Sequence, residues 1–161
     1  MNNQEIMVVY KWTAKEGKAD ELRGIYKDVE QQMQENEPDA LKVACYFEDS
    51  SSTLVVYDLF KDGAALGLHL GTTAAGHFPN LLEVAIPGPF LFCGEVPAEL
   101  KQAALGMGLD ATFAPRVFGF ERYQMKKGGG EYHLLFIYSF ALLMIASSKL
   151  DQETNADQPR K

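Results

Sequence analysis

The strands that this sequence predicts are apolar on both faces, and this limits the folds open to the chain. The first predicted strand covers residues 5–12. One of its faces carries Ile6, Val8, Tyr10 and Trp12, and the other carries Met7 and Val9. Residues 53–60 repeat the pattern with β-branched and aromatic side chains on both sides. Strands of this kind are buried on both faces. The sheet that they form therefore needs a cover on each side.

The predicted elements follow the order β-α-β-β-α-β. Residues 19–33 form an amphipathic helix that stops before Pro38, and residues 41–48 and 53–60 form a hairpin. Further elements are expected as helical stretches at 62–70 and 79–85 and a fourth strand at 90–96. This α+β order is the split βαβ pattern of ferredoxin-like folds. Two helices cover only one face of a four-stranded sheet, so we expect a homodimer that packs sheet on sheet as a dimeric α/β barrel.

Composition and charge exclude several kinds of function. The 161 residues are 47% apolar, which suits one domain with its own core. A net charge of -7 leaves no basic stripe for nucleic acid. Cys45 and Cys93 lack a CxxC spacing, and the polar N-terminus carries no secretory signal, which predicts a cytoplasmic, reduced location. No nucleotide-binding or hydrolase motif is present in the sequence.

Two of the three histidines, His69 and His77, lie eight residues apart in the second helical region. Histidine exchanges protons near neutral pH, so the pair indicates a site for acid–base chemistry, although a surface or capping role is the alternative for each. The small residues 71–76 between them are interpreted as an insertion that leaves their common orientation open. If only one histidine lines a pocket, His69 is favoured. Two histidines without further ligands do not predict a metal site.

The chain continues past the fourth strand in four parts. Residues 97–125 are expected to add a helix and an edge strand to the domain formed by residues 1–96. A glycine-rich linker at 126–131 follows, then an apolar segment at 132–150 and a polar, disordered tail at 151–161. The uncharged stretch Tyr132 to Ser148 is at the lower limit for crossing a bilayer. It is interpreted as a membrane anchor, a helix packed on the domain or dimer, or an additional β segment.

These features resemble the antibiotic biosynthesis monooxygenase (ABM) family. The resemblance rests on the strand ending in Trp12, the segment Val56-Tyr57-Asp58-Leu59-Phe60, and the helix with His69-Leu70 and His77-Phe78. It covers residues 5–96. The family implies dimeric α+β barrels, including small quinol monooxygenases that use O2 without metal or flavin, and relatives that degrade haem. The haem-degrading branch uses Asn, Trp and His, a set that this sequence does not supply in full. We therefore expect no cofactor, with haem as the alternative.

The expected activity is a cofactor-independent monooxygenase that oxidises a small aromatic or quinol substrate with O2. Such a substrate reduces O2 directly once it is deprotonated, so the protein must supply a base and a dry pocket. His69 and His77 are the candidate bases. The candidate substrate-binding residues are Tyr10, Tyr46 and Tyr57 for orienting a phenolic oxygen, and Trp12 and Phe60 for an apolar wall. The alternative is a non-catalytic barrel that binds a small apolar ligand or serves as an accessory domain.

Overall fold

The βαββαβ order is confirmed by the computed structural model, which describes residues 4–120. The elements are β1 (Ile6–Ala14), α1 (Ala19–Asn36), β2 (Ala40–Glu48), β3 (Thr53–Phe60), α2 (Gly63–His69), the π-helix η1 (Leu70–Ala74), α3 (Ala75–Val84), β4 (Ala85–Cys93), α4 (Ala98–Gly106) and β5 (Ala111–Ala114). The α+β ferredoxin-like class predicted from the sequence is therefore correct.

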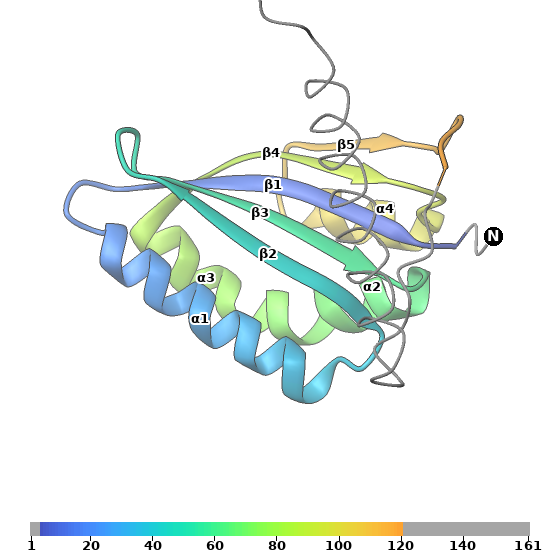
Figure 1. The fold of residues 1–161 in the computed structure, drawn as a ribbon, viewed down its shortest axis with the longest axis horizontal. Helices are drawn as coiled ribbons and strands as arrows, with labels where there is room; N and C mark the ends of the chain where they lie inside the picture. Colours follow the sequence, from blue (N-terminus) through green and yellow to red (C-terminus); the bar gives the residue numbers. More distant parts are fainter. Residues whose placement is uncertain (1–3, 121–161) are drawn as a thin grey trace, which may run out of the picture. The chain divides into compact units, whose positions relative to one another are not determined.

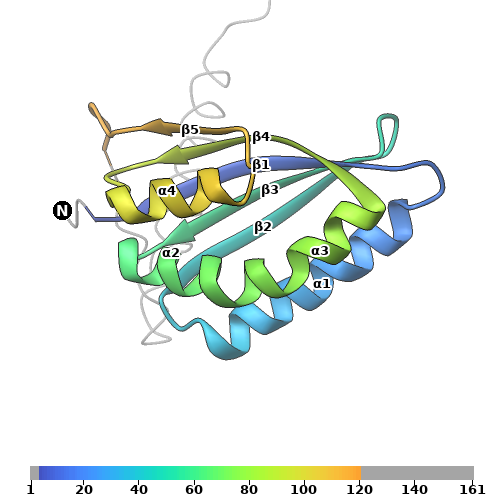
Figure 2. The same cartoon turned by 180° about the vertical axis from the view of Figure 1, so that it is seen from behind.

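The five strands form one sheet in the order β2-β3-β1-β4-β5. The first four pair antiparallel, and β5 joins β4 in parallel after the α4 crossover. The helices all lie on the same side of the sheet: α1 and α3 run below it in both views, and α4 lies behind it in Figure 1 and in front of it in Figure 2. One face of the sheet is thus covered by helices, and the core lies between the two layers.

The period-two alternation of the strands decides which side chains enter this core. Ile6, Val8, Tyr10 and Trp12 of β1 are buried, and they are opposite the buried side chains Phe60, Asp58, Val56 and Leu54 of β3. The helix α1 contributes its predicted stripe of Leu22, Tyr26, Val29 and Met33. The alternate residues of β1 and β3 are directed to the outward face and are less buried. The two-sided apolar pattern of the strands is therefore present in the fold, with one side packed.

The helical region that carries the two histidines is continuous, whereas the sequence predicted two separate helical stretches at 62–70 and 79–85. After α2, the chain passes through η1 directly into α3, which contains Pro79 in its interior. The Asp62 side chain caps the start of α2 by accepting a hydrogen bond from the Ala65 amide at 3.0 Å. Glycine and threonine favour a break in a helix when read from sequence alone. Here the break is replaced by one wide π turn, a feature that often occurs at functional sites.

The fourth strand begins at Ala85, five residues before the predicted start at Phe90. Its pairing with β1 shifts between Tyr10 and Trp12, so that an extra residue of β4 bulges opposite Lys11. A Cβ on Gly88 would come within 2.5 Å of the Lys11 side chain, so a larger residue here would displace that side chain. The prolines at 87 and 89 are tolerated because β5 pairs only with the residues from Phe90 onward. The bulge thus bends β4 beside the aromatic residues of β1.

The extension beyond β4 is a helix and a strand, as predicted, but the strand is shorter than expected. It covers Ala111–Ala114, and residues 115–119 beyond it are irregular. Pro115 has no amide hydrogen for a further ladder bond, which accounts for this end. Within residues 4–120 no helix is long and apolar enough to cross a membrane. The predicted linker at 126–131, the apolar segment at 132–150 and the tail at 151–161 lie outside the described residues.

Candidate functional site

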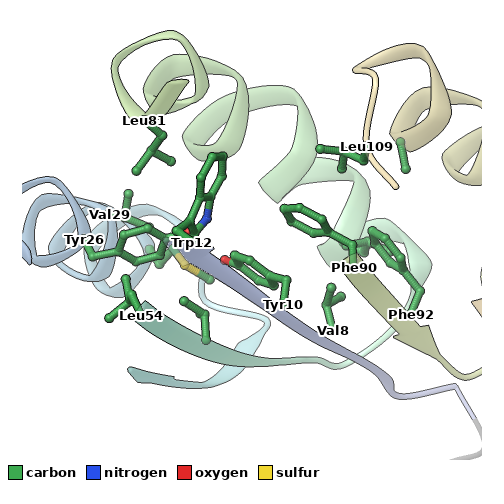
Figure 3. Close-up of a cluster of buried hydrophobic side chains, with 14 of the residues drawn as sticks. Val8, Tyr10, Trp12, Tyr26, Val29, Leu54, Leu81, Phe90, Phe92 and Leu109 are labelled. Atoms are coloured by element: carbon green, nitrogen blue, oxygen red, sulfur yellow. The ribbon is translucent and has the colours of Figure 1, made fainter. Parts of the chain in front are cut away.

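A narrow cavity of about 50 Å³ lies between the inward face of the sheet and the helices. Aromatic side chains line much of it, and Figure 3 shows three of them, Tyr10, Trp12 and Phe90, side by side on β1 and β4. The Tyr10 and Phe90 rings stack with centroids 4.6 Å apart, and Phe78 of α3 meets Trp12 edge-on at 5.8 Å. These contacts make a rigid, apolar wall around a few polar groups.

His69 lies against this cavity with only 6% of its surface exposed, and a buried carboxylate holds its ring. The His69 Nδ1 atom lies 3.1 Å from Glu37 Oε2 and 3.3 Å from Oε1. Because a carboxylate only accepts, Nδ1 carries the proton and donates it to Glu37. The other ring nitrogen, Nε2, then has a free lone pair. Glu37 therefore selects the tautomer of His69 that is able to accept a proton at Nε2.

Thr73 of the π-helix connects both histidines. Its hydroxyl donates a short hydrogen bond to Glu37 Oε1, and its backbone carbonyl accepts a hydrogen bond from His77 Nδ1 at 2.9 Å. In an α-helix, eight residues turn the chain about 80° past two full turns. The wider π turn removes part of that rotation. Both His69 and His77 consequently line the same cavity.

Burial raises the pKa of Glu37, but the hydrogen bonds from His69 and Thr73 outweigh this effect and lower the pKa below its ordinary value. Glu37 is 3% exposed, so this ionised carboxylate is well shielded from water. It is the first residue after α1 and precedes Pro38. A carboxylate at the C-terminal end of a helix is unfavourable for the helix dipole, and the hydrogen bonds from His69 of α2 and Thr73 of η1 compensate for that position.

Asp58 provides a second buried carboxyl on the sheet side of the cavity. Its Oδ2 atom accepts a hydrogen bond from the Tyr10 hydroxyl at 2.9 Å. Burial raises the pKa of Asp58 to about 6, although His69 and the Tyr10 hydroxyl oppose that rise. Burial also raises the pKa of Tyr10 well above its usual value. Asp58 thus lines the cavity as a carboxyl that exchanges protons near neutral pH, while Glu37, bonded to His69, stays ionised.

Two buried polar atoms of the cavity walls have no hydrogen-bond partner within the described part of the chain. They are Asp58 Oδ1, an acceptor, and Trp12 Nε1, a donor. Both residues are 1% exposed. Burial raises the pKa of Tyr26 well above its usual value, although the nearby Tyr10 hydroxyl and the Trp12 indole oppose that rise. A buried polar group without a partner costs roughly 1–3 kcal/mol. A ligand with both a donor and an acceptor would remove this cost.

Five of the seven predicted site residues line this cavity: His69, His77, Tyr10, Trp12 and Phe60. Tyr46 and Tyr57 do not. Tyr57 alternates with Asp58 on β3 and is directed to the outward face. Tyr46 pairs with Val55 of the same outward set and is 62% exposed. The strand register, which the sequence alone left open, separates them from the cavity.

Two residues that sequence reasoning did not assign to the site, Glu37 and Asp58, carry its two buried carboxyls. Asp58 had a usable signal, because a single charged residue in an otherwise apolar strand segment is unusual. The signal for Glu37 was weaker: a carboxylate at the C-terminal end of a helix is unfavourable for the helix dipole. Its partner His69 is 32 residues further along the chain. Only the packing of α1 against η1 brings the two together.

Among residues 4–120, no three His, Cys, Asp or Glu side chains are grouped to hold a metal ion. A cavity of roughly 150 Å³ is known to take up benzene. The space of about 50 Å³ found here is smaller than that.

Comparison with solved structures places this fold among known proteins. The structure resembles MupZ from Pseudomonas fluorescens with a TM-score of 0.63 and 17% identity, covering 74% of this chain and 91% of that one. It also resembles a proposed antibiotic biosynthesis monooxygenase from Caulobacter crescentus, with a TM-score of 0.52 and 20% identity. This match covers 58% of this chain and 92% of that one. A third similar structure is a protein from Bacteroides thetaiotaomicron with the same proposed role. Its TM-score is 0.51 and its sequence identity is 13%, and the match covers 61% of this chain and 93% of that one.

No protein-family model matches the sequence, and no curated protein matches it significantly. The similarity therefore lies in the three-dimensional structure, at identities where sequence comparison gives little signal. The order of elements, the strand order of the sheet and these structural neighbours agree with one another. The chain has the ferredoxin-like fold of the ABM type.

Proposed function

We propose that this protein is a cofactor-independent monooxygenase that oxidises an electron-rich phenol or quinol with O2. The observation that carries the proposal is the buried pair of His69 and Glu37, in which Nδ1 is held and Nε2 is left to act as a base. The fold shared with proteins named as antibiotic biosynthesis monooxygenases supports the same reaction class. Fold alone does not determine chemistry. The side chains of the cavity are therefore the stronger argument.

The reaction begins when His69 Nε2 takes the proton of the phenolic O–H. The phenolate then transfers one electron to O2, and the resulting phenoxyl radical and superoxide combine at a ring carbon. His69 returns its proton to the peroxide. Loss of the hydrogen on that ring carbon and cleavage of the O–O bond form a quinone carbonyl and water. One oxygen atom enters the product and the other leaves as water, so the substrate itself supplies all four electrons. A dry pocket favours this sequence because it removes the hydration shell that stabilises the phenolate in bulk water, so the phenolate gives up an electron to O2 more readily.

The other polar groups are suited to holding a substrate with two oxygens. Asp58 Oδ1 would accept a hydrogen bond from a substrate hydroxyl, and Trp12 Nε1 would donate one to a substrate oxygen. Asp58 and Glu37 would also stabilise the positive charge that His69 gains. Phe60, whose ring centroid is 5.1 Å from that of His69, shields the base from water. Tyr46 and Tyr57 are not part of this arrangement.

Oxygen consumption tests the proposal. A panel of hydroquinones and dihydroxynaphthalenes is incubated with the wild-type protein, with His69→Gln and with His77→Gln, and autoxidation without protein is subtracted. Loss of a general base lowers a rate by roughly 10²- to 10⁴-fold, which is expected for His69→Gln. A much smaller loss is expected for His77→Gln, since its Nδ1 donates to the neutral carbonyl oxygen of Thr73 and not to a carboxylate that would increase the basicity of the ring.

Equal activity in all three proteins would rule out His69 as the base. Binding of the aromatic compounds without any oxygen consumption would favour the alternative function, a non-catalytic barrel that binds a small apolar ligand. Circular dichroism spectra of the variants provide the control for folding. The two histidines are matched for this comparison because both line the same cavity.

We also propose that the protein forms a homodimer through the outward face of its sheet. Met7, Val9, Val55 and Leu59 on this face are apolar and only partly buried, and apolar patches of this kind mark interaction sites. Sedimentation velocity is expected to show a dimer for the wild type and a monomer for Val55→Lys, because the lysine would place a charge in the interface. A wild-type protein that stays monomeric at all concentrations would contradict this proposal.

A further inference from the structure

A second cavity, an apolar groove of about 460 Å³, adjoins the site on the side of α4. It runs between α4 and the helical segment formed by α2, η1 and α3. The groove has no polar side chain along its walls, which include Gly67, Gly71, Leu100 and Ala103. A Cβ on Gly67 would make ordinary van der Waals contact with Leu100, at 3.4 Å, so α4 and α2 lie close together here. The small residues facing α4 leave the space of the groove unfilled.

Three side chains, Leu70, Phe78 and Met107, line both the groove and the inner cavity. They form the partition between the two spaces. Leu70 belongs to the π-helix, Phe78 contacts Trp12 edge-on, and Met107 ends α4. Methionine has an unbranched side chain with three rotatable bonds, which adapts easily to a changed neighbour. A rearrangement of these side chains would join the two spaces without moving a strand of the sheet.

The sizes of the two spaces indicate why they would have to join. The inner cavity, at about 50 Å³, is smaller than the roughly 150 Å³ that takes up one benzene ring. Yet this is the space that holds His69 and the unpartnered polar atoms of Asp58 and Trp12. The groove has the volume but no polar groups. A single ligand that uses both must therefore be polar at one end and apolar at the other.

We propose that the groove is the second half of the ligand site, and that the ligand is an amphipathic phenol with an apolar extension. The phenolic head would lie in the inner cavity against His69, Asp58 and Trp12, and the apolar extension would lie in the groove beside Leu100 and Ala103. This inference rests on the proposed role of the inner cavity as the substrate site, and it names the class of substrate. Burial of the extension contributes affinity in proportion to its length.

Binding of para-alkyl phenols tests this inference without any turnover. Trp12 is the only tryptophan in the chain and lines the inner cavity, so its fluorescence reports occupation of that cavity. Phenol and its para-ethyl, para-butyl and para-hexyl derivatives are titrated into the full-length protein under argon. Each buried methylene group is expected to lower the dissociation constant by roughly fourfold.

Ala103→Phe is expected to remove this dependence on chain length by filling the groove, while the affinity for phenol itself stays unchanged. The matched control is Gln102→Phe, an exposed position on α4 that does not line the groove, and it should keep the full dependence. Both substitutions add the same side chain to the same helix, and neither adds a second tryptophan.

Two results would overturn the inference: affinities that do not change with chain length in the wild type, or the same dependence in Ala103→Phe as in Gln102→Phe. Affinities that do not change with chain length would also be found if a segment of the protein itself fills the groove. Failure of the proposed oxidation is distinguishable from both, because binding is measured without O2. A protein that shows the chain-length dependence but consumes no oxygen would retain the ligand site and lose the proposed reaction.

Discussion

Replacing Glu37 with glutamine is expected to lower the rate of oxygen consumption by roughly 10²- to 10⁴-fold, the range typical of a lost general base. The amide keeps the size of the carboxylate but has only one acceptor oxygen. The Thr73 hydroxyl already donates to Oε1. The amide nitrogen would then take the place of Oε2, 3.1 Å from His69 Nδ1, and would donate to it. His69 would therefore carry its proton on Nε2 and could not accept another from the substrate.

Nitrogen-15 NMR of the histidine ring measures this effect independently of catalysis. The chemical shifts of Nδ1 and Nε2 distinguish the two tautomers, and Glu37→Gln should exchange the assignment at His69 while leaving His77 as it is. Glu35→Gln is the matched control, since Glu35 is an exposed residue on the same helix. An unchanged tautomer at His69, or an unchanged rate with an active substrate, would show that Glu37 does not position the base.

The second large effect is on stability. Asp58→Asn is expected to raise the free energy of unfolding at pH 7, relative to its effect at pH 4, by about 2 kcal/mol, because the unfolded carboxyl is already partly ionised at pH 4. The pKa of Asp58 is about 6 in the folded protein, against a reference value of 3.8, and one unit corresponds to about 1.4 kcal/mol. Between these two values the folded protein holds a proton that the unfolded chain has lost. The stability contributed by that proton is therefore lost as the pH rises through 6.

Denaturant unfolding of the wild type and Asp58→Asn from pH 4 to pH 7 measures this change. Asparagine keeps an acceptor for the Tyr10 hydroxyl but cannot ionise, so it removes the dependence that comes from Asp58. Comparing the two proteins at each pH cancels the contributions of other groups, including Glu37, whose lowered pKa acts in the opposite direction. Asp28→Asn, an exposed position on α1, gives the baseline for loss of one charge. A difference that is constant with pH would contradict the prediction.

The strand and helix boundaries were largely predictable because they depend on local patterns. The stripe of Leu22, Tyr26, Val29 and Met33 identified α1, and all four residues are buried in the fold. The alternation in β1 and β3 identified the residues of each face. Hydrophobic periodicity of this kind follows directly from the geometry of helices and strands. The ferredoxin-like order of the elements followed from the same patterns.

The local predictions failed where the chain departs from regular geometry. Two separate helical stretches were predicted at 62–70 and 79–85, but one π turn joins them into a continuous helical segment. The strand β4 was expected only after Pro89, although a bulge lets it begin at Ala85. In both places the local preferences of glycine and proline argue against the structure that forms. Packing against β1 and α1 overrides those preferences.

By itself, the sequence determined the class of the fold, the position of His69 and His77 in one helical region, and the aromatic character of β1. These properties depend on residues near one another in the chain. The pairing of His69 with Glu37 and the separation of Tyr46 and Tyr57 from the cavity were decided only by the tertiary structure. They depend on strand register and on contacts between residues more than thirty positions apart, which no local pattern encodes.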